Sequence, residues 1–127
     1  MGSHVQVRGF DHLVLNVADT ERSLSFYCGE LGMTPVRVEQ WRRKEVFFPS
    51  VRVDDGTIID LVEVPRTGEN ADHFCVVVER TDFDALKASG RFEVVDGPDR
   101  RFGARGEGTS LYIRDPDRNM VELRYYD

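Results

Sequence analysis

The sequence predicts an α+β fold made of two βαβββ modules, and three observations support this prediction. The chain has 127 residues, the length of one ordinary domain, and its 40% hydrophobic and 31% charged residues are typical of soluble globular proteins. An offset of 61 aligns His12 with His73, and an offset of 62 aligns Asp60 with Glu122. The signals for strands and helices recur with the same period, so we expect the two halves to share one topology.

The first module, residues 9–64, begins with an apolar run over residues 10–17 that suits a strand. Asp19 or Thr20 can cap the helix that follows, and Gly32 can end it. The apolar residues at helical spacing in this helix are Leu24, Tyr27 and Leu31. The three strands expected to complete the module are residues 36–41, 46–53 and 57–64, the last two joined by a turn at residues 54–56.

The second module, residues 71–127, follows a polar hinge at residues 65–70. We expect its first strand at residues 73–79 and its helix at residues 82–89, with Gly90 as the stop. The three strands expected to complete it are residues 92–95, 109–114 and 120–126, the last two joined by a turn at residues 115–119.

Composition excludes several classes of partner. The chain has 17 Lys and Arg against 23 Asp and Glu, a net charge of -6, whereas binding nucleic acid needs a clustered basic excess. No apolar run approaches the roughly 18 residues of a membrane span, and the N-terminus lacks the layout of a signal peptide. We therefore expect a cytoplasmic protein that binds a small molecule. Residues 1–8 read as an N-terminal extension that starts with what looks like a vector remnant, Met1-Gly2-Ser3.

Four polar side chains occupy equivalent places in the two modules. His12 and Asp60 are 48 positions apart, and His73 and Glu122 are 49 apart. A carboxylate inside an apolar strand is costly unless it is paired, hydrogen-bonded or bound to a metal. If the halves pack around a pseudo-two-fold axis, all four side chains converge on the concave side of a cupped mixed sheet. Two imidazoles and one or two carboxylates suit a divalent first-row metal with positions left open for water or substrate.

Structural roles compete with this metal site. A histidine in a strand is usually a satisfied core residue, and Glu122 can pair with Arg124 on the same face of its strand. The matching positions favour His12, His73 and Glu122 as metal ligands. Asp60 is left open between a metal ligand and a residue that hydrogen-bonds to the ligands. The bound metal would polarise a carbonyl while a carboxylate, Asp60 or Glu122, relays protons.

Three residues are candidates for binding the substrate. Arg105 lies among three glycines, in a segment that is either a mobile loop bringing a guanidinium to an anionic substrate or a plain hairpin connection. Trp41 and Phe47 either line an apolar cavity or serve as core or dimer contacts.

Several stretches of the sequence resemble the vicinal oxygen chelate superfamily, which includes glyoxalase I, bleomycin-resistance proteins and extradiol dioxygenases. The resemblance covers about residues 9–126. Its most specific parts are FDHLVLNVAD (residues 10–19), SFY (25–27), LGM (31–33) and YIRDPD (112–117) with Asn119, Val121 and Glu122. The resemblance implies the cupped sheet of the glyoxalase, bleomycin resistance and dihydroxybiphenyl dioxygenase fold. It also implies a metal held by His12, His73 and Glu122.

The resemblance also sets expectations for activity and assembly. It implies a metal-dependent, glyoxalase-like lyase or isomerase acting on a small carbonyl or oxygenated metabolite, with Zn, Ni, Mn, Fe or Co as the metal. The alternatives are an extradiol-type dioxygenase and a non-catalytic, drug-binding protein of the bleomycin-resistance kind. Members with two modules commonly form homodimers whose sites are shared between chains, and we expect the same here. The sequence departs from the family at Asp60, where glyoxalase-type enzymes carry Glu, and at Arg118, where the family turn has Gly.

Overall fold

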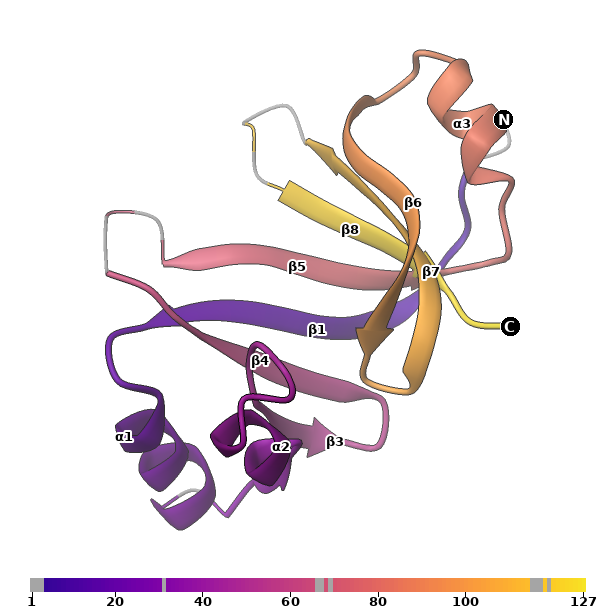
Figure 1. Cartoon of the computed structure of the whole chain (residues 1–127). Helices are drawn as coiled ribbons and strands as arrows, with labels where there is room; N and C mark the ends of the chain where they lie inside the picture. The colour runs from indigo at the N-terminus through magenta and orange to yellow at the C-terminus, as the bar shows by residue number, and fades with distance from the viewer. Residues whose placement is uncertain (1–3, 31, 66–67, 69, 115–117, 119) are drawn as a thin grey trace. The chain divides into compact units, whose positions relative to one another are not determined.

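The computed structural model describes residues 4–30, 32–65, 68, 70–114, 118 and 120–127 (Figure 1). Its strands form a mixed eight-stranded sheet in the order β2-β3-β4-β1-β5-β8-β7-β6. The chain divides into two compact units, a first unit of His12–Asp72 and a second unit of Met1–Asp11 with His73–Asp127. Strand β1 (Val7–Val17) contributes to both units, because the boundary follows Asp11.

Some predicted features lie outside the described residues. They are the remnant at residues 1–3, the helical residue 31, and parts of the hinge (66, 67 and 69) and of the turn (115–117 and 119). Among the helices that the structure describes, none is long and apolar enough to cross a membrane.

In the first unit, two short helices cover one face of the strands. After β1 come α1 (Thr20–Leu24), the π-helix η1 (Ser25–Glu30), β2 (Thr34–Val36), α2 (Val38–Arg42), β3 (Ser50–Asp54) and β4 (Thr57–Glu63). The Asp19 side chain accepts a hydrogen bond from the Arg22 N–H and caps α1. Leu24, Val38 and Leu61 belong to one buried cluster, so α1 and α2 pack on β4, as Figure 1 also shows.

The predicted strand at residues 36–41 is wrong. The strand β2 ends at Val36, and α2 begins at Val38. Val38 and Trp41 stand three positions apart, the spacing that brings two side chains to one face of a helix, and both pack in the core of the first unit. A stretch of five residues satisfies strand alternation and helical spacing equally well, so packing decides. The strand expected at residues 46–53 also begins later, at Ser50.

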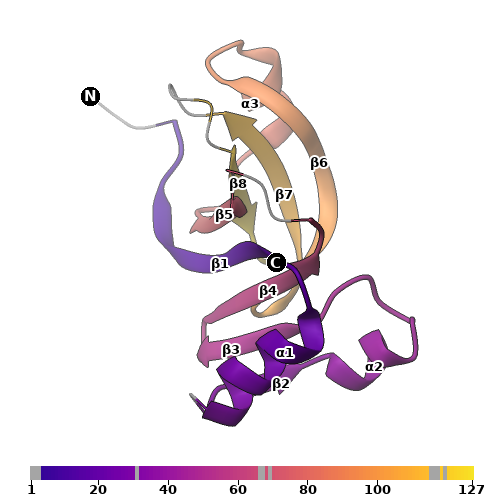
Figure 2. The ribbon, with the colours of Figure 1, turned by 90° about the vertical axis from the view of Figure 1, so that its left-hand side faces the viewer.

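In the second unit, the strands and one helix follow the predicted βαβββ order. They are β5 (Ala71–Val78), α3 (Phe83–Ala88), β6 (Glu93–Gly103), β7 (Gly106–Arg114) and β8 (Met120–Tyr125), and Figure 2 shows β6 and β7 side by side. Phe83 and Leu86 of α3 are buried against Leu111 and Leu123 of the sheet. Gly90 adopts a φ of 72°, the left-handed conformation expected of a helix stop.

Strand β6 differs from the prediction, which ended the strand at residue 95. The strand runs on to Gly103 because it pairs with β7 through two register shifts, around Asp96 and Asp99. The residues around Asp96 and Asp99 therefore form irregularities of the β-bulge kind within a paired strand, and the strand does not end there. Arg118, which stands where the family turn carries Gly, has a φ of 71°, a left-handed conformation that strains a residue with a side chain.

Candidate functional site

In the second unit, His73 and Glu122 meet on one face of the sheet. Strands β5 and β8 are parallel with Cys75 opposite Glu122, so His73 lies two residues away on the same face. The His73 Nε2 atom is 3.0 Å from Glu122 Oε1, and the side chains are 12% and 0% exposed. The structure thus brings together the two predicted ligands of this unit.

The other oxygen of Glu122 is held by two donors from the same unit. The Ser110 hydroxyl donates to Glu122 Oε2 at 2.6 Å, and the Arg124 Nη1 group donates to the same oxygen at 3.0 Å. The pairing of Glu122 with Arg124, which the sequence offered as a structural alternative to metal binding, is therefore present. Because Oε2 serves these donors, Oε1 is the oxygen directed at His73.

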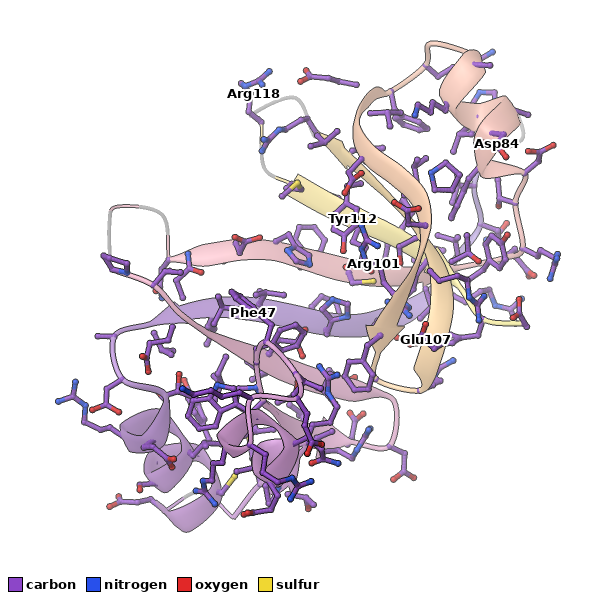
Figure 3. All side chains as sticks on the ribbon, in the orientation of Figure 1. Phe47, Asp84, Arg101, Glu107, Tyr112 and Arg118 are labelled. Atoms are coloured by element: carbon purple, nitrogen blue, oxygen red, sulfur yellow. The ribbon has the colours of Figure 1, made fainter. Side chains whose placement is uncertain are left out.

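Two further side chains beside Glu122 keep their protons. Burial, followed by the charge of Glu122, raises the pKa of Tyr112 above its usual range. The Tyr112 ring is edge-on to His73 with 5.3 Å between centroids, and Figure 3 shows Tyr112 near Arg101. Burial, followed by Glu122 and Asp11, also raises the pKa of Cys75. A protonated thiol is a poor nucleophile, so we assign Cys75 no nucleophilic role.

The first unit contains a matching arrangement. Strands β1 and β4 are parallel with Val14 opposite Asp60, which places His12 two residues away on the same face. The His12 Nε2 atom is 3.8 Å from Asp60 Oδ2, and both side chains are 3% exposed. Asp60 Oδ1 accepts a hydrogen bond of 2.5 Å from the Ser50 hydroxyl. Each unit therefore brings a histidine, a buried carboxylate and a buried serine together, with His12 buried and His73 half-buried.

The contact between histidine and carboxylate is closer in the second unit than in the first. The 3.0 Å between His73 Nε2 and Glu122 Oε1 is a hydrogen-bond distance, whereas the 3.8 Å between His12 Nε2 and Asp60 Oδ2 is longer than a hydrogen bond. Imidazole nitrogen and carboxylate oxygen are both donors that bind divalent first-row ions, so the chemistry of these side chains fits a metal.

The three predicted substrate-binding residues lie in different surroundings. Arg105 is exposed at the turn between β6 and β7, which is the plain hairpin connection, and its guanidinium lies 5.5 Å from the Tyr126 ring centroid. Trp41 packs on the core of the first unit. Phe47 is 82% exposed in the segment before β3 (Figure 3).

Ser50, Ser110 and Asp11 were not predicted as residues of the site, and Arg124 was predicted as a partner of Glu122 but not as a buried residue. Ser50 and Ser110 stand 60 positions apart, close to the repeat offsets, so the self-comparison contained their signal. Asp11 and Arg124 are both fully buried, although such residues are usually exposed. The signal for their burial is indirect: Gly103 and Gly108, on strands that neighbour Arg124 in space, leave room for a large side chain.

Comparison with known proteins identifies relatives over nearly the whole chain. The model of the Glyoxalase/Bleomycin resistance protein/Dioxygenase superfamily matches residues 9–123. The glyoxalase domain-containing protein RDO1 of Mycosarcoma maydis is 35% identical over 96% of this chain and 70% of its own length. A virulence protein of Salmonella typhimurium is 30% identical over 91% of this chain and 83% of its own length.

Solved structures show the same fold at lower identity. Methylmalonyl-CoA epimerase from Mycobacterium tuberculosis matches with a TM-score of 0.70 and 20% identity, covering 100% of this chain and 93% of that one. A Mn(II)-bound glyoxalase from Novosphingobium aromaticivorans matches with a TM-score of 0.68 and 18% identity, covering 95% of this chain and 40% of that one. At these identities the likeness concerns the fold alone.

Proposed function

The chain belongs to the glyoxalase/bleomycin resistance protein/dioxygenase superfamily, and from this premise we propose that it is a metal-dependent enzyme of the lyase or isomerase type. We propose that its substrate is a small metabolite bearing a carbonyl or neighbouring oxygens. The observation that carries this proposal is that the half-buried His73 and the buried Glu122 meet on one face of the sheet, because imidazole and carboxylate are the donors that divalent first-row ions prefer.

We propose His12, His73 and Glu122 as the metal ligands. Imidazole and carboxylate donors suit Zn, Ni, Mn, Fe and Co, so the donor set supports a divalent first-row ion without selecting one. A bound ion of this kind would supply Lewis-acid chemistry, polarising a carbonyl oxygen of the substrate. The structurally similar glyoxalase from Novosphingobium aromaticivorans is Mn(II)-bound, which supports the expectation of a divalent metal.

Asp60 is proposed as the group that moves a proton, with Glu122 as the second candidate. The Ser50 hydroxyl holds Asp60 Oδ1 and thereby fixes the direction of the other carboxylate oxygen. A carboxylate fixed in this way can take a proton from carbon next to a carbonyl and return it to a neighbouring carbon.

The decisive experiment measures metal in protein purified without added metal, followed by titration with Mn²⁺, Ni²⁺, Zn²⁺, Co²⁺ and anaerobic Fe²⁺. We expect one ion per chain and its loss in His12→Ala, His73→Ala and Glu122→Ala variants. His4→Ala is the matched control, because His4 is an exposed histidine outside the strands. Absence of any stoichiometric ion in the wild-type protein would overturn the proposal and favour a drug-binding protein. Bound iron with oxygen consumption would favour a dioxygenase instead.

We further propose a cytoplasmic homodimer whose metal sites take ligands from both chains. Mixing His12→Ala with Glu122→Ala chains tests this, because a shared site regains one intact set of ligands in the mixed dimer. The expected result is a dimer in sedimentation and metal binding restored to part of the mixture. A monomer, or no restoration in a mixed dimer, would contradict sharing between chains.

A further inference from the structure

Arg124 is a fully buried arginine that contacts both Glu122 and the hairpin joining β6 and β7. Its Nη1 group donates to Glu122 Oε2 at 3.0 Å and to the Phe102 carbonyl at 3.2 Å. Its Nη2 group donates to the Arg101 carbonyl at 2.6 Å and to the Gly106 carbonyl at 3.3 Å. One rigid, planar guanidinium therefore joins a proposed metal ligand to both sides of the hairpin turn.

The hairpin is shaped to receive this guanidinium. A Cβ atom at Gly103 would lie 2.5 Å from Arg124 Cζ, and a Cβ atom at Gly108 would lie 2.8 Å from Arg124 Nη2. Any side chain at either position would therefore displace the arginine. The Tyr126 ring lies 4.9 Å from Arg124 Cζ and covers the guanidinium on another side.

Asp11 completes the network from strand β1. Its Oδ2 atom accepts a hydrogen bond from the Ala104 N–H at 3.0 Å and lies 4.0 Å from Arg124 Nε. Its Oδ1 atom accepts a hydrogen bond from the Tyr126 hydroxyl at 2.5 Å. Asp11 thus holds the tip of the same hairpin that Arg124 holds through its carbonyls.

The buried charges of this network do not cancel. Among the described residues of the second unit, Asp11 and Glu122 are the fully buried carboxylates, and Arg124 is the fully buried cation. One positive charge stands against two negative charges, and a second positive charge beside the carboxylates is supplied either by a protonated His73 or by a bound metal ion. Because Arg124 and Ser110 both use Oε2, the oxygen left toward that cation is Oε1, which faces His73.

We infer that Arg124 is a positioning residue that aims Glu122 Oε1 at the metal and couples the metal site to the β6–β7 hairpin. This inference rests on the proposed function, since it assumes that Glu122 binds a metal. Residues that orient a metal ligand from behind typically affect metal affinity by about 10- to 100-fold. The coupling also implies that an ion held by Glu122 makes the hairpin more rigid, because the Arg124 guanidinium donates hydrogen bonds both to Glu122 and to three carbonyls of the hairpin.

The test displaces Arg124 without removing it. Gly103→Ala places a methyl group against Arg124 and Asp11 side chains, whereas Gly9→Ala, the matched control in β1, has no atom within 4 Å of its new methyl group. Mn²⁺ binding to the full chain is followed by calorimetry and by EPR, with circular dichroism to verify folding. We expect Gly103→Ala to weaken Mn²⁺ binding about 10- to 100-fold and Gly9→Ala to leave it within about twofold.

A second measurement on the wild-type protein does not depend on any variant folding. Hydrogen exchange of backbone amides in residues 101–107 is compared with and without Mn²⁺, and we expect the ion to slow it about tenfold. If the wild-type chain binds Mn²⁺ but Gly103→Ala binds it equally well, or the hairpin amides are unaffected, the inference about Arg124 is overturned and the proposed function stands. If the wild-type chain binds none of the divalent ions, the proposed function fails and the inference fails with it.

Discussion

Replacing Arg124 with Met tests how much the buried guanidinium contributes to stability. Methionine keeps an unbranched, flexible stem but removes the charge and four hydrogen bonds, to Glu122 and to the carbonyls of Arg101, Phe102 and Gly106. The larger loss is electrostatic, because both Asp11 and Glu122 stay buried without their cation. Breaking a buried pair by removing one partner costs about 3–5 kcal/mol. A chain of 127 residues has a total stability of about 6–19 kcal/mol, so this one change removes a large fraction of it.

Urea unfolding, followed by circular dichroism, measures this loss, and two further variants show its cause. Arg101→Met is the matched control, since Arg101 also pairs with two carboxylates, Asp96 and Asp99, but on the surface. We expect this control to lose less than about 1 kcal/mol. Adding Asp11→Asn to Arg124→Met removes one of the uncompensated charges while retaining a side-chain oxygen as acceptor. We expect the double variant to be about 1–3 kcal/mol more stable than the sum of the single losses predicts.

Two results would refute this reasoning. A loss of less than about 1 kcal/mol in Arg124→Met would mean that the buried carboxylates are neutralised by something other than the guanidinium. Additive losses in the double variant would mean that Asp11 and Arg124 do not interact, despite the shared network. An unchanged dependence of the unfolding free energy on urea concentration is the check that the folded and unfolded states remain comparable.

Three further predictions concern single side chains. Burial, followed by its hydrogen bond to the buried carboxylate of Asp11, raises the pKa of Tyr126, so the folded chain keeps this proton at a pH where the unfolded chain loses it. The free energy of unfolding should therefore fall as pH rises above about 10, and it should fall less steeply in Tyr126→Phe. Urea titrations at several pH values measure both slopes. Trp41→Ala should lower the free energy of unfolding by about 2 kcal/mol because the indole packs on the core of the first unit. Phe47→Ser, at a side chain that is 82% exposed, should change it by less than about 0.5 kcal/mol, as measured from the midpoint of urea unfolding. Equal effects would contradict the placing of Trp41 in the core and of Phe47 on the surface. Arg118→Gly should raise thermal stability by about 0.5–1 kcal/mol, since relief of a positive φ outweighs loss of an exposed pair with Glu93, and a lower melting temperature would show the reverse.

The internal repeat made the polar pairs predictable. Strand alternation and the offset of 61 indicated that His12 and His73 occupy equivalent positions, and the pairing of β1 with β4 and of β5 with β8 has the same register at both. A period of two along a strand is a strong local signal, so the faces of these strands followed from the sequence. The division of the chain into modules at residues 9–64 and 71–127 and the roles of the site residues stay predictions.

The features that could not be predicted depend on contacts between distant residues. A buried arginine has no local signature, because burial of Arg124 becomes favourable only when Asp11, Glu122 and the hairpin carbonyls surround it. The helix α2 was missed because five residues are too few for periodicity to separate helix from strand. The extension of β6 through Asp96 and Asp99 depends on its pairing with β7, which composition does not reveal.

Strand β1 places two buried polar side chains next to each other, Asp11 in the second unit and His12 in the first. Asp11 accepts hydrogen bonds from the Ala104 N–H and the Tyr126 hydroxyl, and these bonds fix the face to which the side chains of β1 point before the boundary. The pairing of His12 with Ile58 of β4 fixes that face after the boundary. A single residue inserted or deleted between them would leave the strand able to satisfy only one of the two sets of partners, because every side chain beyond the change would turn to the opposite face. The number of residues in β1 between these two sets of partners is therefore fixed by contacts on both sides of the boundary.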